Sequence, residues 1–125
     1  GKNVRDWIYV EDHCDAVLST LNHGKSGESY NVSANNEIDN ITVVRKILEI
    51  MNKPDDLIEF VEDRPGHDLR YSLDSTKISD QLEWKVKSSF EEGLEKTVQW
   101  YLDNPELLNN ISSTILDSTP WKNTN

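Results

Sequence analysis

The feature that most constrains the fold is a change in the spacing of apolar residues within the first 22 positions. Residues 4–10 alternate with a period of two, so Arg5, Trp7 and Tyr9 share one face of a predicted strand. Residues 12–22 switch to helical spacing, and the helix carries one apolar stripe: Cys14, Val17, Leu18 and Leu21. We expect this stripe to be buried. A strand that runs directly into a helix indicates an α/β arrangement.

The same alternation continues along the chain. Short strands are expected at 29–32 and 57–61, and helices at 41–52, 75–82 and 90–103. Side-chain caps are predicted for the three helices: Asn40, Asp74, and the Ser89–Glu92 capping box. The polar run 33–40 reads as a loop. These patterns predict a small mixed α/β domain with a sheet of about two or three strands.

Residues 63–71 form the most chemically distinctive stretch, with the sequence Asp-Arg-Pro-Gly-His-Asp-Leu-Arg-Tyr. The Pro-Gly pair interrupts regular structure, so these side chains are expected on a loop. Arginines there offer forked donors suited to phosphate or carboxylate, as does Arg5 on the first strand. Two alternatives stay open: a solvated turn with incidental ion pairs, and an ion pair between Arg5 and an aspartate at a sheet edge.

Composition narrows the classes of partner. The chain has 125 residues, enough for one domain, and a net charge of -10. This charge argues against nucleic acid and anionic membranes as partners, and it makes phosphate binding depend on locally placed arginines. A hydrophobic content of 35% is low for a compact globule. We therefore expect part of the exposed surface to be natural partner surface.

The single cysteine, Cys14, excludes an internal disulfide and fits a reducing cytoplasm. The sequence contains neither an apolar run long enough to span a bilayer nor a signal-peptide pattern. Residues 109–125 are mostly polar, so we expect a flexible tail in which Trp121 is the candidate docking residue.

A run of three possible metal ligands, Glu11, Asp12 and His13, lies on the first predicted helix. Side chains of successive helical residues point in different directions around the axis, so we expect these three at the surface and not around one metal ion.

Five segments, in order along the chain, carry a family resemblance: Val4–His13, Gly27–Val32, Asp63–Tyr71, Leu82–Trp84 and Glu92–Tyr101. Together they resemble the dTDP-glucose 4,6-dehydratase family of extended short-chain dehydrogenases/reductases. The resemblance extends from residue 1 to about residue 108. The first and fourth segments are shared with related nucleotide-sugar epimerases and decarboxylases, whereas the loop 63–71 points to the dehydratase.

The resemblance covers only the C-terminal part of such an enzyme. It implies that residues 1–108 form the nucleotide-sugar-binding lobe of an NAD-dependent lyase, a homodimer in its intact form. The N-terminal Rossmann half would carry the glycine-rich NAD-binding loop and a Tyr-x-x-x-Lys pair, and neither pattern occurs in this sequence. The chain also begins without methionine, so we expect a piece of a longer protein, without a catalytic residue or NAD site of its own.

By the same resemblance, five residues would contact a dTDP-sugar. Arg5 matches an arginine that binds the diphosphate, and Arg64 matches a second substrate-binding arginine. Asp63 and His67 match positions in the nucleotide pocket, and Asn40 matches a substrate-binding asparagine at a helix start. Without the family, Asn40 reads as a helix cap and His67 as a solvent-exposed loop residue. Two alternative functions remain: an epimerase or decarboxylase lobe, and a non-catalytic binding module.

Overall fold

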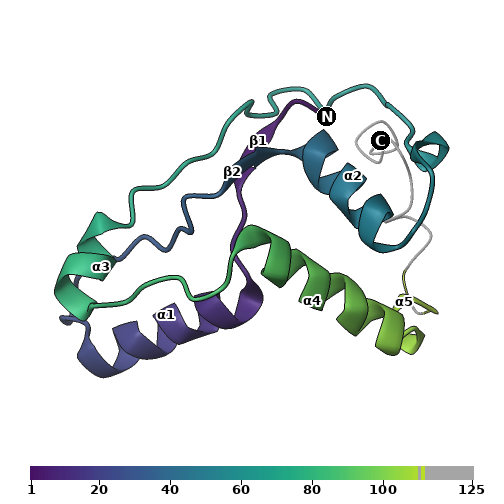
Figure 1. Ribbon diagram of the computed structural model, residues 1–125. Coiled ribbons are helices and arrows are strands. Elements are labelled where there is room, and N and C mark those ends of the chain that lie inside the picture. The colour runs from purple at the N-terminus through teal and green to yellow at the C-terminus, as the bar shows by residue number, and fades with distance from the viewer. Residues whose placement is uncertain (110, 112–125) are drawn as a thin grey trace.

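The computed structural model describes residues 1–109 and residue 111. Its elements, shown in Figure 1, are β1 (Val4–Asp6), α1 (Val10–His23), β2 (Glu37–Asp39), α2 (Asn40–Ile50), the 3-10 turn η1 (Asp55–Leu57), α3 (Thr76–Leu82), α4 (Phe90–Asp103) and α5 (Glu106–Asn109). The chain thus has the mixed α/β composition that the sequence predicts. The expected flexible tail falls almost entirely outside the described residues.

A two-stranded antiparallel sheet lies between two pairs of helices. β1 pairs with β2 in the register Val4–Asp39, Arg5–Ile38 and Asp6–Glu37. Figure 1 shows α1 and α3 on one side of this ribbon and α2 and α4 on the other. The sheet therefore joins the two pairs of helices.

The loop 63–71 is bound to the free edge of β1. The backbone N–H of Val4 donates to the Leu69 carbonyl at 2.7 Å, and the N–H of Tyr71 donates to the Val4 carbonyl at 3.0 Å. These bonds form a parallel bridge between Val4 and Arg70. As a result, the end of the loop is attached to the sheet although the loop has little regular structure of its own.

The predicted strands at 29–32 and 57–61 are wrong, and so is the extension of the first strand to Val10. Among the described residues neither segment pairs with a strand, and β2 forms instead within the run 33–40 that we expected to be a loop. Residue type favours extended backbone at 29–32 and 57–61 more than at 37–39, but a strand also needs a neighbour to accept its hydrogen bonds. Only residues 37–39 find one, in β1.

Capping residues set the starts of the helices. The prediction that Asn40 caps the second helix is wrong by one residue, because Asp39 Oδ1 accepts from the Thr42 N–H at 2.9 Å. Asn40 is therefore the first helical residue, and its side chain is not used as a cap. The predicted capping box is confirmed: Ser89 Oγ accepts from the Glu92 N–H, and Glu92 accepts from the Ser89 N–H. Asp74 accepts from the Thr76 N–H at 2.9 Å, beside the start of α3.

The core lies between α1 and α3. Ala16, Ile78 and Trp84 are buried there, and five half-buried residues pack against them: Ile8, Tyr30, Val32, Leu82 and Val86. The predicted strand residues Tyr30 and Val32 thus contribute to the core without pairing in a sheet. Helices α2 and α4 contact each other, and Val43, Phe90 and Val98 are buried on them.

Helix α1 has its apolar stripe facing solvent, which contradicts our expectation for Cys14 and its neighbours. Val10, Val17, Leu18 and Leu21 are 53–78% exposed, and Cys14 is exposed as well. The buried residues of the helix are Asp12 and Ala16. Helical spacing identifies an apolar face, but it does not say which part of a protein covers that face.

The expectation that Asp12 is a surface acid is also wrong. Its carboxylate is 2% exposed and accepts the backbone N–H groups of Lys87 and Ser88, each at 3.1 Å. Glu11 and His13 are exposed, as expected. These two hydrogen bonds connect α1 to the segment that leads into α4. They also explain why the carboxylate can be buried, since a buried charge is tolerated only where hydrogen-bond donors satisfy it.

Candidate functional site

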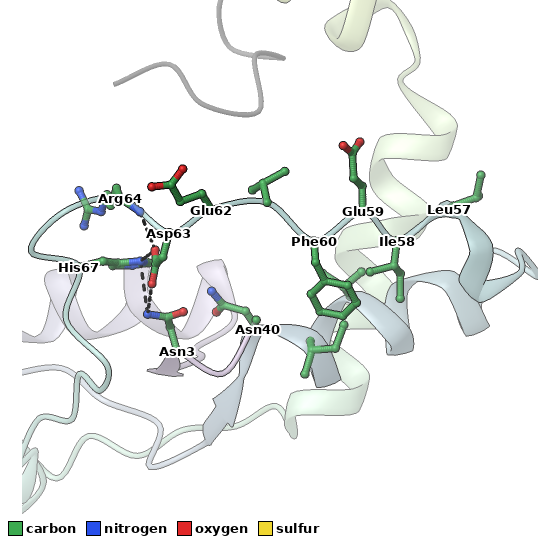
Figure 2. A pocket seen from close by; sticks show the side chains of 14 residues that line it. Asn3, Asn40, Leu57, Ile58, Glu59, Phe60, Glu62, Asp63, Arg64 and His67 are labelled. Atoms are coloured by element: carbon green, nitrogen blue, oxygen red, sulfur yellow. Dashed lines mark hydrogen bonds and ion pairs between the residues drawn. The ribbon is translucent and has the colours of Figure 1, made fainter. Parts of the chain in front are cut away.

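A pocket of about 410 Å³ opens between the start of the chain, the first turns of α2 and the extended segment 57–64. It is lined by Gly1, Asn3, Asn40, Ile41, Val44, residues 57–64 and His67. Figure 2 shows Ile58 and Phe60 directed to the opposite side of the segment from Leu57 and Glu59. The pocket therefore combines apolar side chains at one end with a group of amide, carboxylate and imidazole side chains at the other.

The structure brings four of the five predicted site residues to this pocket: Asn40, Asp63, Arg64 and His67. They come from two segments more than 20 positions apart, the start of α2 and the loop 63–71. Arg5 is not part of the lining. It is connected to the pocket through His67, whose Nε2 lies 2.8 Å from Arg5 Nη2.

Asp63 and His67 form a close pair at the polar end of the pocket. His67 Nδ1 lies 2.6 Å from Asp63 Oδ1, and the His67 side chain is only 19% exposed. The hydrogen bond from His67 lowers the pKa of the Asp63 carboxyl, with smaller contributions from the Arg64 N–H and the Asn3 amide, whereas partial burial acts in the opposite direction. His67 is thus a bound residue of the loop and not the freely solvated one that was the alternative.

Arg5 is held by several groups of the loop. Its guanidinium donates to the carbonyls of Val4 at 2.6 Å and Asp68 at 3.0 Å, and it lies 4.7 Å from the centre of the Tyr71 ring. Tyr71 in turn donates from its hydroxyl to Asp68 Oδ2 at 2.5 Å, which raises the pKa of the phenol. Arg5 has no ion pair with a carboxylate in the described part of the chain, contrary to the alternative reading of the sequence.

Asn40 and Arg64 keep unused donors. The Asn40 backbone N–H donates to the Asn3 carbonyl at 3.0 Å, and its side-chain amide has no protein partner among the described residues. The Arg64 backbone N–H donates to Asp63 Oδ1 at 2.9 Å, but its guanidinium has neither a hydrogen bond nor an ion pair within residues 1–109. Figure 2 shows this guanidinium on the outer side of the loop, away from Asn40.

Sequence reasoning missed Asn3. Its side chain is 8% exposed, and its amide donates to the Asp68 carbonyl at 3.3 Å and weakly to Asp63 Oδ2 at 3.5 Å. A lone asparagine ahead of a strand matches no motif, so only the path of the loop reveals its role. Arg70 holds the end of the loop through two hydrogen bonds to Glu37.

The pocket is built for binding. The side-chain amide of Asn40 and the guanidinium groups of Arg64 and the nearby Arg5 are suitable donors for the oxygens of a diphosphate or a sugar, and the apolar end suits a flat ring. The structured part of the chain contains no group of three potential metal ligands. It also contains no helix with the length and apolarity needed to cross a membrane.

Comparison with known proteins places the chain in a family. A family model described as GDP-mannose 4,6 dehydratase matches residues 1–97. The chain belongs to the GDP-mannose 4,6-dehydratase family. A protein of Sinorhizobium fredii described as a probable dTDP-glucose 4,6-dehydratase is 47% identical over 111 residues, which are 83% of this chain and 32% of that protein. The resemblance to dTDP-glucose 4,6-dehydratases seen in the sequence is confirmed.

Solved structures with similar folds agree. A dTDP-glucose 4,6-dehydratase from Streptomyces venezuelae with NAD bound is 37% identical, with a TM-score of 0.82 over 86% of this chain and 33% of that one. A UDP-glucose 4-epimerase from Thermotoga maritima with UDP-glucose is 30% identical, with a TM-score of 0.77 over 84% and 33%. The chain therefore spans about a third of the length of the relatives that it matches.

Proposed function

We propose that this chain is the substrate-binding part of a dTDP-glucose 4,6-dehydratase. The parent enzyme would be an NAD-dependent lyase that converts dTDP-glucose to dTDP-4-keto-6-deoxyglucose for deoxysugar biosynthesis of the rhamnose type. The observation that carries the proposal is the gathering of Asn40, Asp63, Arg64 and His67 around one pocket. The resemblance predicts that these residues bind the substrate, and they come from two segments more than 20 positions apart in the sequence.

The roles follow from the free donors of the site. The Asn40 amide and the Arg64 guanidinium are unsatisfied by protein groups within the described residues, so a ligand oxygen can take them without breaking a contact. Arg5 and Arg64 would supply the cationic charge for the diphosphate in a chain with a net charge of -10. Phe60 and Ile58 offer the apolar surface on which a flat base can lie.

The chain alone is proposed to bind but not to react. It contains no Tyr-x-x-x-Lys pair and no glycine-rich dinucleotide loop, so its residues do not fit NAD. Oxidation at C4, loss of water across C5 and C6, and reduction at C6 would all need groups outside this sequence. Purified chain is expected to form no 4-keto-6-deoxy sugar from dTDP-glucose and NAD above a control with substrate alone.

The exposed stripe of α1 supports a partner for this chain, namely the Rossmann half of the parent enzyme. Val10, Val17, Leu18 and Leu21 are exposed along one face, and a soluble protein rarely leaves such a stripe uncovered. We propose that residues 1–108 form the nucleotide-sugar-binding lobe and that the parent enzyme is a homodimer. We also propose that the parent enzyme works in the cytoplasm, where a single free cysteine is stable.

The proposal is tested by titrating the chain with dTDP, UDP and inorganic pyrophosphate while following backbone amide shifts by NMR. We expect dTDP to shift amides at Asn40 and in 58–67, while amides of α1 stay unchanged. Absence of shifts at Asn40 and 58–67 at millimolar dTDP would remove the pocket from nucleotide binding. The likeness to UDP-glucose 4-epimerase keeps that activity as a second candidate, and tighter binding of UDP than dTDP would favour it.

A further inference from the structure

We propose that His67 is a positioning residue for Arg5, held by Asp63 in one neutral tautomer. The functional part of this inference, which concerns ligand affinity, rests on the proposed function. The structural part stands on a continuous series of contacts that runs from Asp63 Oδ1 to His67 Nδ1 at 2.6 Å, and from His67 Nε2 to Arg5 Nη2 at 2.8 Å.

The chemistry of the arginine determines the tautomer. A guanidinium has only N–H donors, so His67 Nε2 must be the acceptor in its contact with Arg5. A neutral imidazole has one donor and one acceptor, which places the proton on Nδ1, where it is donated to Asp63. In a doubly protonated ring, Nε2 would also carry a proton, so two donors would face each other at the contact with Arg5.

The surrounding amide agrees with this tautomer. Asn3 Nδ2 lies 3.3 Å from His67 Nδ1, and since both nitrogens then carry protons, this contact is not a hydrogen bond. The same amide nitrogen donates instead to the Asp68 carbonyl and to Asp63 Oδ2. Both partners are acceptors, so the nitrogen and not the oxygen of Asn3 faces the loop.

The consequence concerns the donors that Arg5 has left. Its contacts with the Val4 carbonyl, the Asp68 carbonyl and His67 use three of the five N–H groups of a guanidinium, which leaves Nε and one hydrogen on Nη1. The Tyr71 ring lies against the guanidinium at 4.7 Å. His67 therefore sets the direction in which Arg5 presents its remaining donors beside the pocket. Preorganised donors lose less entropy when an anion binds.

The first test needs no variant and no ligand. Long-range ¹H–¹⁵N spectra of this chain at neutral pH report which imidazole nitrogen of His67 carries the proton. We expect the Nδ1–H tautomer. A dominant Nε2–H tautomer would contradict the arrangement, because Nε2 would then be unable to accept from Arg5. His23, which is exposed on α1, serves as an internal reference.

The second test compares His67→Gln with His67→Ala. A glutamine amide can accept from Arg5 through its oxygen and donate to Asp63 through its nitrogen, whereas alanine can do neither. We expect the Nη resonances of Arg5 to broaden in His67→Ala and to remain sharp in His67→Gln. For dTDP we expect roughly tenfold weaker binding in His67→Ala, as for loss of one charged hydrogen bond, with most of the affinity restored in His67→Gln.

Two results would overturn the proposal: Arg5 resonances unchanged in His67→Ala, or a His67→Gln variant that loses as much dTDP affinity as His67→Ala. The second would mean that the imidazole itself touches the ligand. If wild-type chain binds no dTDP at all, the proposed function fails, while the tautomer and the Arg5 resonances still decide whether His67 positions Arg5.

Discussion

Arg70 binds Glu37 through two parallel hydrogen bonds, from Nε to Oε2 at 2.5 Å and from Nη2 to Oε1 at 2.8 Å. Glu37 lies on β2, and Arg70 is at the end of the loop that carries Asp63, Arg64 and His67. The pair lowers the pKa of Glu37 and raises that of Arg70. The loop is thereby attached to both strands, to β1 by its backbone and to β2 by this side chain.

Removal of this pair is expected to loosen the loop without unfolding the chain. In Glu37→Ala, the amides of Val4 and Tyr71, which join the loop to β1, should exchange faster with solvent. The increase should be at most about tenfold, because an exposed ion pair contributes little to stability. Hydrogen exchange followed by NMR measures this. Glu59→Ala is the matched control, since Glu59 is exposed and has no hydrogen bond or ion pair within the described residues. Equal exchange rates in the two variants would contradict the attachment.

Loss of Arg64 is expected to weaken nucleotide binding. Arg64→Ala should reduce dTDP affinity by roughly tenfold to a hundredfold, the range for a lost charge-assisted hydrogen bond, and Arg64→Lys should recover only part of it. Calorimetric titration measures both variants. Arg45→Ala is the control, because Arg45 lies on α2 and pairs with Asp55 outside the pocket. Unchanged dTDP affinity in Arg64→Ala would remove this side chain from the site.

Asp12 is predicted to be the acid on which the packing of α1 most depends. Asp12→Ala removes the acceptor of two backbone N–H groups, at Lys87 and Ser88, and should cost about 1–3 kcal/mol of unfolding free energy. Urea denaturation followed by circular dichroism gives the value. The neighbouring exposed acid Glu11 provides the control, and Glu11→Ala should change stability far less. A similar loss in both variants would mean that the two N–H groups find other acceptors.

The exposed stripe of α1 is expected to make the isolated chain self-associate. Replacing Leu18 or Leu21 with lysine should shift the chain toward monomer, since a charge within an apolar contact is costly. Analytical ultracentrifugation over a range of concentrations measures the change. Leu73→Lys places the same charge at an exposed leucine outside α1 and should have no such effect. A chain that is monomeric before any substitution would argue against a partner surface on α1.

Stability is expected to fall as the pH drops below about 4. The pKa of Glu92 is lowered by the Ser89 N–H, that of Asp39 by Thr42, and that of Asp63 by His67. A carboxyl with a depressed pKa in the folded state stabilises it fully above its unfolded pKa, near 4. This contribution disappears as the pH falls through the lower, folded value.

The acid dependence is measured by urea denaturation at a series of pH values. Glu92→Gln keeps the capping contacts but cannot titrate, so its stability should depend less steeply on pH below 4. Glu95→Gln is the control, because Glu95 lies on the same helix and accepts no hydrogen bond among the described residues. An identical pH dependence in wild type and Glu92→Gln would contradict the role of the capping carboxylate.

Local patterns predicted the helices well because their signals are carried by neighbouring residues. Ser89 and Glu92 contact each other within one turn, so their spacing alone marks the start of α4. The site could be predicted only by family resemblance. The Pro65-Gly66 pair indicates that Arg64 and His67 share a loop. Nothing in the spacing of Asn40 and Asp63 indicates that they line one pocket.

The sequence by itself determined the helix positions, the interruption of regular structure at Pro65-Gly66 and the family, all of which depend on local order along the chain. Only the tertiary structure decided which extended segments became strands, that Asp12 is buried while Leu18 and Leu21 are exposed, and that His67 joins Asp63 to Arg5. The physical reason is that pairing, burial and hydrogen bonding depend on groups brought together from distant positions. A local pattern specifies a surface or a donor, and the fold supplies its partner.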